Sequence, residues 1–146
     1  MTSEIVRVAV VNGWPDSYRK VLLEKRADGH YHTPVFRLNF EALYTQKDVE
    51  NVTKDLISDF IRKWFDGLTF KSIKFLGRTK NNRYPLYMVE FEGWPEPKDE
   101  PSNFRFVDPF NLMPKGDALE TLSKIEEEFK KREQKKTSDS VLINLH

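Results

Sequence analysis

The sequence contains no cysteine, which excludes disulfide bonds, thiolate metal sites and cysteine nucleophiles. It also has no apolar run that approaches the length of a membrane-spanning helix. The N-terminal stretch MTSEIVRVAVV lacks the basic start and the small-residue cleavage site of a secretory signal. From these absences we expect a cytoplasmic protein without disulfides that does not act at a membrane.

An excess of one charge sign is missing as well. Lysine and arginine together number 24, and aspartate and glutamate number 23, which gives a net charge of +1. This balance argues against a general binder of polyanions, although it leaves room for a local patch. The length of 146 residues, with 38% hydrophobic and 13% aromatic residues, suits one globular domain with a substantial core.

Hydrophobic patterning predicts an α+β domain over residues 1–133, followed by a charged, flexible tail over 134–146. The run IVRVAVV is apolar almost throughout, which is typical of a strand buried on both faces. We expect strands at residues 5–11, 18–26, 30–40, 70–79, 84–91 and 103–107, and helices at 45–66 and from Asp117 onward. A proline-rich loop is expected at 93–101.

The helix expected at residues 45–66 has the clearest signals. Thr45 and Asp48 form a capping-box pattern at its start, and Gly67 is suited to end it. At 100° per residue, one face of this helix is apolar. That face comprises Val49, Val52, Leu56, Phe60 and Trp64, widened by Ile57 and Ile61.

The same helix carries an acidic stripe. Asp48, Asp55, Asp59 and Asp66 fall within about 40° of one another on the helical wheel. Carboxylates are ligands that Mg²⁺ prefers, so one interpretation is a weak Mg²⁺ or Mn²⁺ site. The other is a solvated face, with Asp48 acting as a cap and Asp59 paired with Lys63. We favour the solvated face.

Three stretches, in this order of elements, resemble the Nudix family. VLLEKR resembles the second-strand segment of Nudix domains, and NFRFVDPFNL resembles the family's late stretch before a short helix. Between them the helix at residues 45–66 lies where the Nudix box belongs. The resemblance spans roughly residues 4–132. It implies a mixed β-sheet sandwiched between helices in a single domain.

In the family, the glutamates of the box bind divalent cations that neutralise a diphosphate while water attacks. The best placement sets KDLISD against the family's R-E-U-x-E-E, where U is aliphatic. Lys54 then replaces the arginine, Ser58 replaces one glutamate, and Asp55 and Asp59 replace two others. Gln46 stands where the first glutamate belongs. The resemblance thus implies a degenerate box, with Lys54, Asp55 and Asp59 as candidate catalytic residues and the two aspartates as candidate metal ligands.

Five further side chains are candidate binding residues. His30 and His32 alternate along a strand that corresponds to the mouth of the substrate site in Nudix domains. Arg19, Arg26 and Arg37, with nearby aromatic residues, could form a basic surface for a nucleotide or single-stranded RNA. Solvated strand edges guarded by cations account for the same charges.

The leading hypothesis is a degenerate Nudix-like domain that acts as a binding module for a nucleotide, an RNA or a protein partner, with no cofactor expected. One alternative is a divergent pyrophosphohydrolase acting on a nucleoside diphosphate derivative with Mg²⁺ or Mn²⁺, with further ligands such as Glu90, Glu92 or Glu96. A second alternative is a structural subunit of a larger assembly, favoured by the amphipathic last helix and the apolar C-terminal tip.

Overall fold

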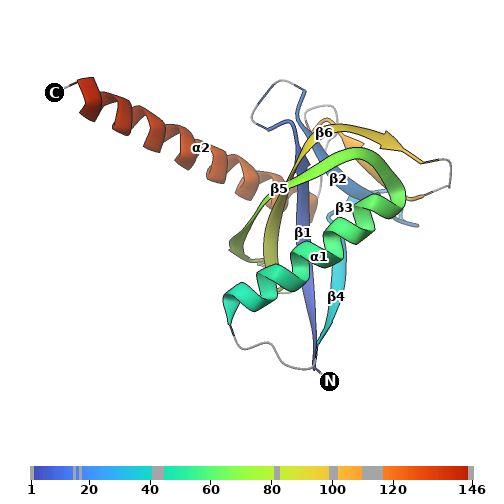
Figure 1. Ribbon diagram of the computed structural model, residues 1–146. Helices are drawn as coiled ribbons and strands as arrows, with labels where there is room; N and C mark the ends of the chain where they lie inside the picture. Colours follow the sequence, from blue (N-terminus) through green and yellow to red (C-terminus); the bar gives the residue numbers. More distant parts are fainter. Residues whose placement is uncertain are drawn as a thin grey trace.

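The computed structural model describes residues 2–14, 16, 18–40, 45–80, 83–98, 102–109 and 117–144. In this part of the chain a seven-stranded sheet lies between two helices (Figure 1). The strands are β1 (Thr2–Asn12), β2 (Lys20–Lys25), β3 (Tyr31–His32), β4 (Val35–Phe40), β5 (Phe65–Arg78), β6 (Pro85–Pro97) and β7 (Phe104–Val107), and the helices are α1 (Gln46–Trp64) and α2 (Asp117–Asn144). The predicted α+β fold class, a single domain with a mixed sheet between helices, is confirmed.

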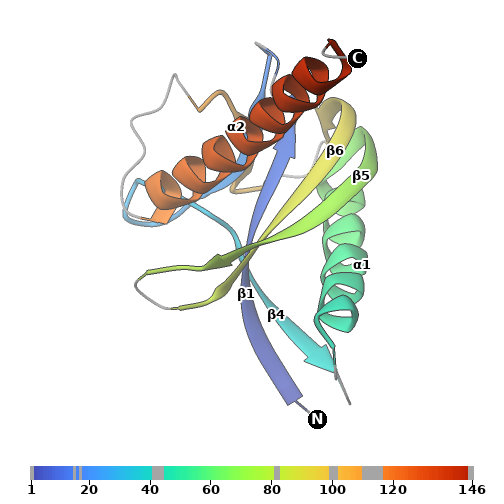
Figure 2. The ribbon, with the colours of Figure 1, turned by 90° about the vertical axis from the view of Figure 1, so that its left-hand side faces the viewer.

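The main path of the sheet has the order β3-β2-β1-β6-β5, with β4 also paired to β1 and β7 paired to β2. Strand β1 runs parallel to β6, with Val8 opposite Tyr87 and Val10 opposite Val89. The other pairings of the described strands are antiparallel. The helices cover opposite faces of this mixed sheet (Figure 2).

Strand β1 is the centre of the core because it is covered on both faces, as its apolar sequence predicts. Val8 and Val10 face the α1 side, where Ile57 belongs to the same buried cluster. Ala9 and Val11 face the α2 side. The cluster on the α2 side also contains Trp14, Val21, Leu23, Leu86, Met88, Ala118, Leu122 and Ile125.

Helix α1 begins as predicted and ends earlier than predicted. Thr45 Oγ1 accepts from the amide of Asp48 at 3.1 Å, and Asp48 Oδ2 accepts from the amide of Thr45 at 3.2 Å. The helix stops at Trp64 because Phe65 is extended and continues directly into β5. The predicted stop at Gly67 is therefore wrong, since Gly67 lies inside β5.

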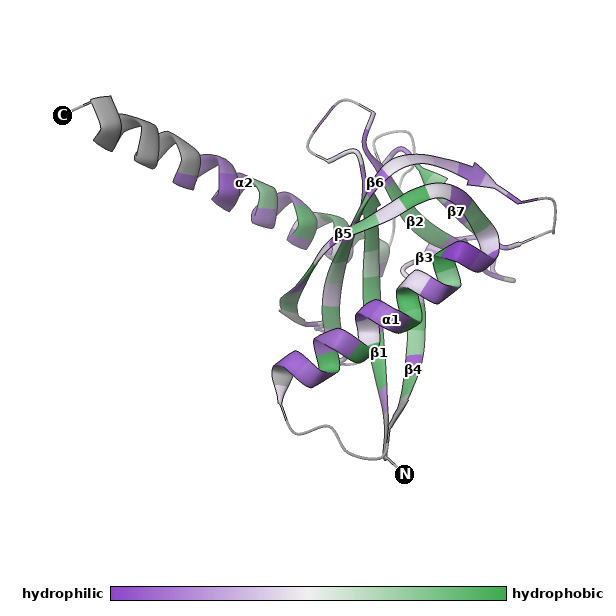
Figure 3. Ribbon diagram, viewed as in Figure 1, coloured by the Kyte–Doolittle hydropathy of each residue, from purple (hydrophilic) through white to green (hydrophobic). Residues whose placement is uncertain are grey.

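The apolar face of α1 packs on the sheet as predicted, but its most buried line is shifted. Ile57 and Ile61 are fully buried, whereas Phe60 is half-buried. The Phe60 ring reaches sideways to Phe36 and Phe104, at centroid distances of 5.1 and 4.7 Å. Ile57 and Ile61 thus pack directly beneath the helix, and the ring of Phe60 covers the side of this contact. In Figure 3 hydrophilic and hydrophobic residues alternate along α1, as expected for an amphipathic helix.

The β5–β6 hairpin is longer than predicted. Strand β6 continues through Pro97, so the loop predicted at residues 93–101 is wrong for 93–97. Gly67 and Gly93 make this extension possible, because a Cβ on Gly93 would lie 2.1 Å from the carbonyl oxygen of Gly67. Both glycines have positive φ, at +85° and +110°. A register shift between Asp66 and Leu68 marks a bulge at the same point.

Helix α2 begins at Asp117 as predicted and continues through Asn144, across most of the segment predicted to be a flexible tail. Ala118, Leu122 and Ile125 hold its first half on the sheet. Toward its C-terminal end the helix leaves the sheet (Figure 1). Neither described helix is both long enough and apolar enough to span a membrane.

Candidate functional site

An ion cluster with two buried carboxylates lies between α2 and the sheet. Glu90 of β6 and Glu128 of α2 are each only 5% exposed. Arg132 joins them, with Nη1 3.1 Å from Glu90 Oε1 and Nε 3.2 Å from Glu128 Oε1. Lys74 Nζ lies 2.6 Å from Glu128 Oε1, and the hydroxyl of Ser72 donates to Glu90. Each buried carboxylate therefore has a cationic partner.

Glu128 and Arg132 stay charged at neutral pH. Burial alone would raise the pKa of Glu128, but hydrogen bonds from Lys74 and Arg132 lower it below its ordinary value. Burial likewise opposes the charge of Arg132, yet its hydrogen bonds to Glu90 and Glu128 raise its pKa. Glu128 and Arg132 therefore form a fixed ion pair and are not an acid and a base poised to exchange protons near pH 7.

A cleft of about 610 Å³ opens beside the ion cluster, between α2, the β1–β2 turn and the sheet. Its volume falls within the range of about 300–1,000 Å³ that is typical of small-molecule sites. The cleft is lined by the cations Arg19, Lys71, Lys130 and Arg132, the carboxylates Glu90, Glu126 and Glu133, and the rings of Trp14 and Phe129. It combines apolar surface with an excess of cationic groups.

The walls of the cleft are held by contacts between rings and cations. Trp14 stacks on Phe129 with centroids 5.6 Å apart and an interplanar angle of 22°. Arg19 Cζ lies 5.0 Å from the centroid of Trp14, and Arg132 Cζ lies 4.8 Å from that of Phe129. Trp14 Nε1 also donates to the carbonyl of Lys20 at 3.1 Å. The β1–β2 turn is thereby fastened to α2, so the cleft is formed before any ligand enters.

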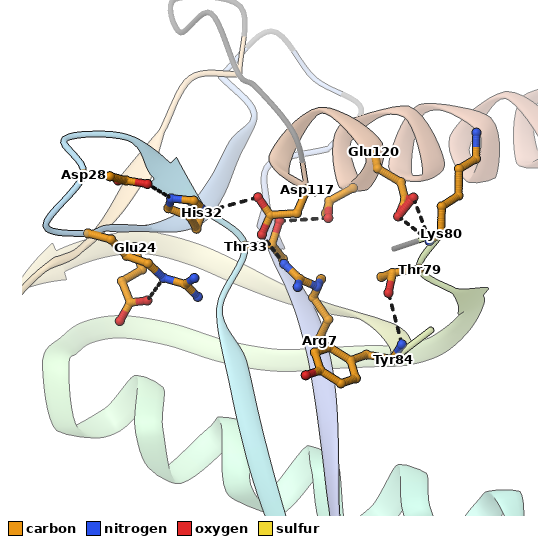
Figure 4. Close-up of polar contacts among 12 residues, drawn as sticks. Arg7, Glu24, Asp28, His32, Thr33, Thr79, Lys80, Tyr84, Asp117 and Glu120 are labelled. Carbon is orange, nitrogen blue, oxygen red and sulfur yellow. Dashed lines mark hydrogen bonds and ion pairs between the residues drawn. The ribbon is translucent and has the colours of Figure 1, made fainter. Parts of the chain in front are cut away.

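A second polar cluster lies at the N-terminus of α2 (Figure 4). The buried guanidinium of Arg7 on β1 binds Asp117, the first residue of α2. His32 lies between two carboxylates, with Nδ1 3.3 Å from Asp117 Oδ1 and Nε2 2.8 Å from Asp28 Oδ2. The backbone amide of His30 and the side chain of His32 lower the pKa of Asp28.

Two further contacts complete this second cluster. Thr33 Oγ1 donates to Thr121 Oγ1 at 2.8 Å, and the amide of Lys80 donates to Glu120 Oε1 at 3.0 Å. The start of α2 is therefore attached to β1, to β3, to the segment between β3 and β4, and to the residues that follow β5. Because Asp117 binds both Arg7 and His32, the cluster fixes the start of the helix.

Of the predicted acidic stripe, Asp48, Asp55 and Asp59 lie on α1, whereas Asp66 lies in β5, beyond the end of the helix, so the stripe is shorter than predicted. Asp55 and Asp59 are exposed, and Asp59 pairs with Arg62, so the predicted pairing with Lys63 is wrong. Lys54 is half-buried, with Nζ 4.8 Å from the centroid of Phe70 on β5. Among the described residues, no three His, Asp or Glu side chains converge as a metal site.

The five predicted binding residues do not form one surface. Arg19 lines the cleft, and His32 belongs to the second polar cluster. His30 and Arg37 are exposed, and Arg26 Nε lies 2.8 Å from a carboxylate oxygen of Glu24.

Most cleft residues were missed, because they come from segments far apart in the sequence and no local pattern joins them. Glu128 and Arg132 are four residues apart in the sequence, the spacing of an i,i+4 helical pair. In the structure Glu128 faces the sheet. Glu90, a candidate metal ligand in the hydrolase hypothesis, is bound by Arg132, whereas Glu92 and Glu96 are exposed.

No family model matches the chain, and no curated protein matches its sequence. Among solved structures, the C-terminal domain of mouse MUTYH in complex with human PCNA is similar, with 14% identity over 88% of this chain and 90% of that chain and a TM-score of 0.49. The NUDIX domain of Shewanella oneidensis NrtR, complexed with ADP ribose, is 11% identical over 86% of each chain, with a TM-score of 0.43. The Nudix hydrolase RenU from M. smegmatis is 12% identical over 71% of this chain and 69% of that chain, with a TM-score of 0.39.

The mixed seven-stranded sheet with its two helices is consistent with a Nudix-like α+β fold. These similarities concern the fold alone and assign no ligand, activity or partner to this chain.

Proposed function

We propose that this domain is a binding module that holds a nucleotide-class ligand in the cleft between α2 and the β1–β2 turn, without hydrolysing it. Arg19, Lys71 and Lys130 supply positive charge for the phosphates. The edges of Trp14 and Phe129 supply an apolar wall for the base. Arg132 is already bound to Glu90 and Glu128, so its part is to shape the wall.

The position of α1 carries the proposal. The cleft opens on the face of the sheet that α2 covers. Helix α1 covers the opposite face (Figure 2), and Asp55 and Asp59 are exposed on it. A metal ion held by these aspartates would be separated from a ligand in the cleft by the whole thickness of the sheet. Diphosphate hydrolysis by metal ions requires contact with the reacting phosphates. A ligand in the cleft would therefore be bound and left intact.

Isothermal titration calorimetry with ADP, adenosine and inorganic phosphate tests the binding. We expect ADP to bind most tightly, because only ADP engages the cations and the aromatic wall together. Lys71→Gln and Lys130→Gln should each raise the Kd for ADP by about 5- to 30-fold, the effect of losing 1–2 kcal/mol. Lys63→Gln, on exposed α1, is the matched control and should leave the Kd unchanged. An equal loss of ADP affinity in all three variants would contradict the proposal that ADP binds in the cleft.

Product analysis separates binding from hydrolysis. ADP incubated with the protein and Mg²⁺ or Mn²⁺ should remain intact, as followed by ³¹P NMR. Metal-dependent turnover that disappears in Asp59→Asn would favour the pyrophosphohydrolase instead, because the metal would then act from α1.

A further inference from the structure

Two exposed aromatic rings flank a groove on the other side of the β1–β2 turn from the cleft. Trp94 is 65% exposed and Tyr18 is 51% exposed. The groove between them has a volume of about 180 Å³, and Phe65 and Phe106 contribute to its lining. Large aromatic side chains that stay exposed together around a hollow mark an interaction site more often than isolated ones do.

The backbone beneath Trp94 is rigidly built. A Cβ on Gly67 would lie 2.3 Å from the carbonyl oxygen of Trp94, so glycine is required at that position. Asn12, which is 3% exposed, donates from Nδ2 to the carbonyls of Phe91 at 3.2 Å and Gly93 at 2.9 Å. A buried amide and a close glycine contact thus fix the strand that carries Trp94. The exposed ring belongs to a preorganised surface and not to a loose loop.

The two charged residues that line the groove are both cations. Lys20 of β2 and Arg105 of β7 line it, and the described residues that line it include no carboxylate. Arg105 is held at the rim, where its Nη1 donates to the carbonyl of Phe104 at 2.9 Å. Asp16 lies in the neighbouring hollow, and its hydrogen bond with the Tyr18 hydroxyl raises the pKa of that phenol. The groove therefore favours an occupant that combines flat rings with negative charge.

We propose that this groove binds a segment of single-stranded nucleic acid, with bases stacked on Trp94 and Tyr18 and phosphates contacted by Lys20 and Arg105. At about 180 Å³ the groove is smaller than the 300–1,000 Å³ of typical small-molecule sites, so it accommodates one ring of a longer chain. Proline-rich peptides also dock on aromatic grooves, but their recognition does not need a groove whose charged lining residues are both cations. The proposal does not depend on the nucleotide cleft.

Fluorescence anisotropy of a fluorescein-labelled uridine octamer with the full chain tests this site. Trp94→Ala should raise the Kd about 5- to 150-fold, the effect of losing one stacked base, and Trp94→Phe should retain most of the affinity. Arg105→Gln should reduce the slope of log K against log salt by about 0.7, the contribution of one phosphate contact on a single strand. Phe75→Ala is the matched control, because Phe75 is also exposed but does not line the groove.

Four outcomes decide the proposal. A thymidine octamer bound with similar affinity supports it, because stacking and phosphate contacts do not need the ribose hydroxyl. Three outcomes overturn it. The first is an octamer affinity that does not change in Trp94→Ala, the second is equal affinity for duplex RNA, and the third is no binding of either octamer. A titration of the Trp94→Ala variant with ADP distinguishes the groove from the cleft. If the variant loses octamer binding but still binds ADP, the loss is assigned to the groove.

Discussion

The two helices cover the same sheet in chemically different ways. Under α1 the contact is mostly apolar, with Ile57 and Ile61 fully buried against the valines of β1 and Thr53 as a buried polar residue. Under α2 the contact also contains Glu90 and Glu128, both nearly buried and both paired with cations. The α1 side holds the fold through hydrophobic burial, whose contribution scales with area. The α2 side additionally holds charges that are costly to bury and must remain paired.

The comparison also separates the two acidic regions. The aspartates of α1 are conspicuous in sequence, yet they lie in water. Glu90 and Glu128 are less conspicuous, yet they shape a cleft. Acidic residues on a regular stripe are therefore a weaker guide to a site than acidic residues brought together by tertiary structure.

The largest expected effect is on the apolar side. Ile57→Ala should lower the free energy of unfolding by about 2–5 kcal/mol, because it leaves a cavity between α1 and the sheet. Leu56→Ala should cost less, since Leu56 is only half-buried. Urea denaturation of both variants measures the difference. Equal losses would mean that the buried line of α1 is not centred on Ile57 and Ile61.

The ion cluster should come next. Glu90→Gln keeps the shape of the side chain but removes the charge that Arg132 binds, so it should cost about 1.5–3 kcal/mol. Glu92→Gln, two residues along the same strand and exposed, should change stability by less than about 0.5 kcal/mol. Urea midpoints of the two variants give the comparison. A silent Glu90→Gln would show that the cluster contributes nothing to holding α2.

The pH dependence of stability should differ between variants of the cluster. The pKa of Glu128 is lowered in the folded protein from an ordinary value of 4.5. The stability that it contributes is therefore fully present above about pH 4.5 and is lost as the pH falls through the lower folded value. Glu128→Gln should be less stable than the parent at pH 7, and the gap should narrow as the pH is lowered. Urea unfolding at several pH values measures this gap, and a constant gap would contradict the assigned shift.

The smallest effects are expected on the acidic stripe. Asp55→Asn and Asp59→Asn should change stability by less than about 0.5 kcal/mol, because both side chains are exposed. Millimolar Mg²⁺ or Mn²⁺ should not raise the melting temperature, since a ligand stabilises only above its dissociation constant. Thermal unfolding with and without the metals is the measurement. A metal-dependent rise that Asp59→Asn removes would restore the stripe as a metal site.

Local chemistry made much of the fold predictable from the sequence. The capping box of Thr45 and Asp48 lies within four residues, and the apolar run of β1 already implied burial on both faces. The close contact between Gly67 and Gly93 was not predictable, because it depends on the register of two distant strands. For the same reason the sequence could not reveal that Arg132 reaches Glu90. Arg19 was predicted as a binding residue, but its partner ring, Trp14, was not.

The parallel pairing of β1 with β6 has a consequence for the order of folding. Arg7 pairs with Leu86 and Asn12 with Phe91, so the central strand finds this neighbour only across more than half of the chain. Such distant pairing carries a large loop-closure cost and slows folding relative to helical proteins of similar size. During synthesis, β1 can pair with β4 early, but it cannot pair with β6 until the β5–β6 hairpin has been synthesised. A chain interrupted before Pro85 would expose one edge of its central strand, which makes it a target for aggregation.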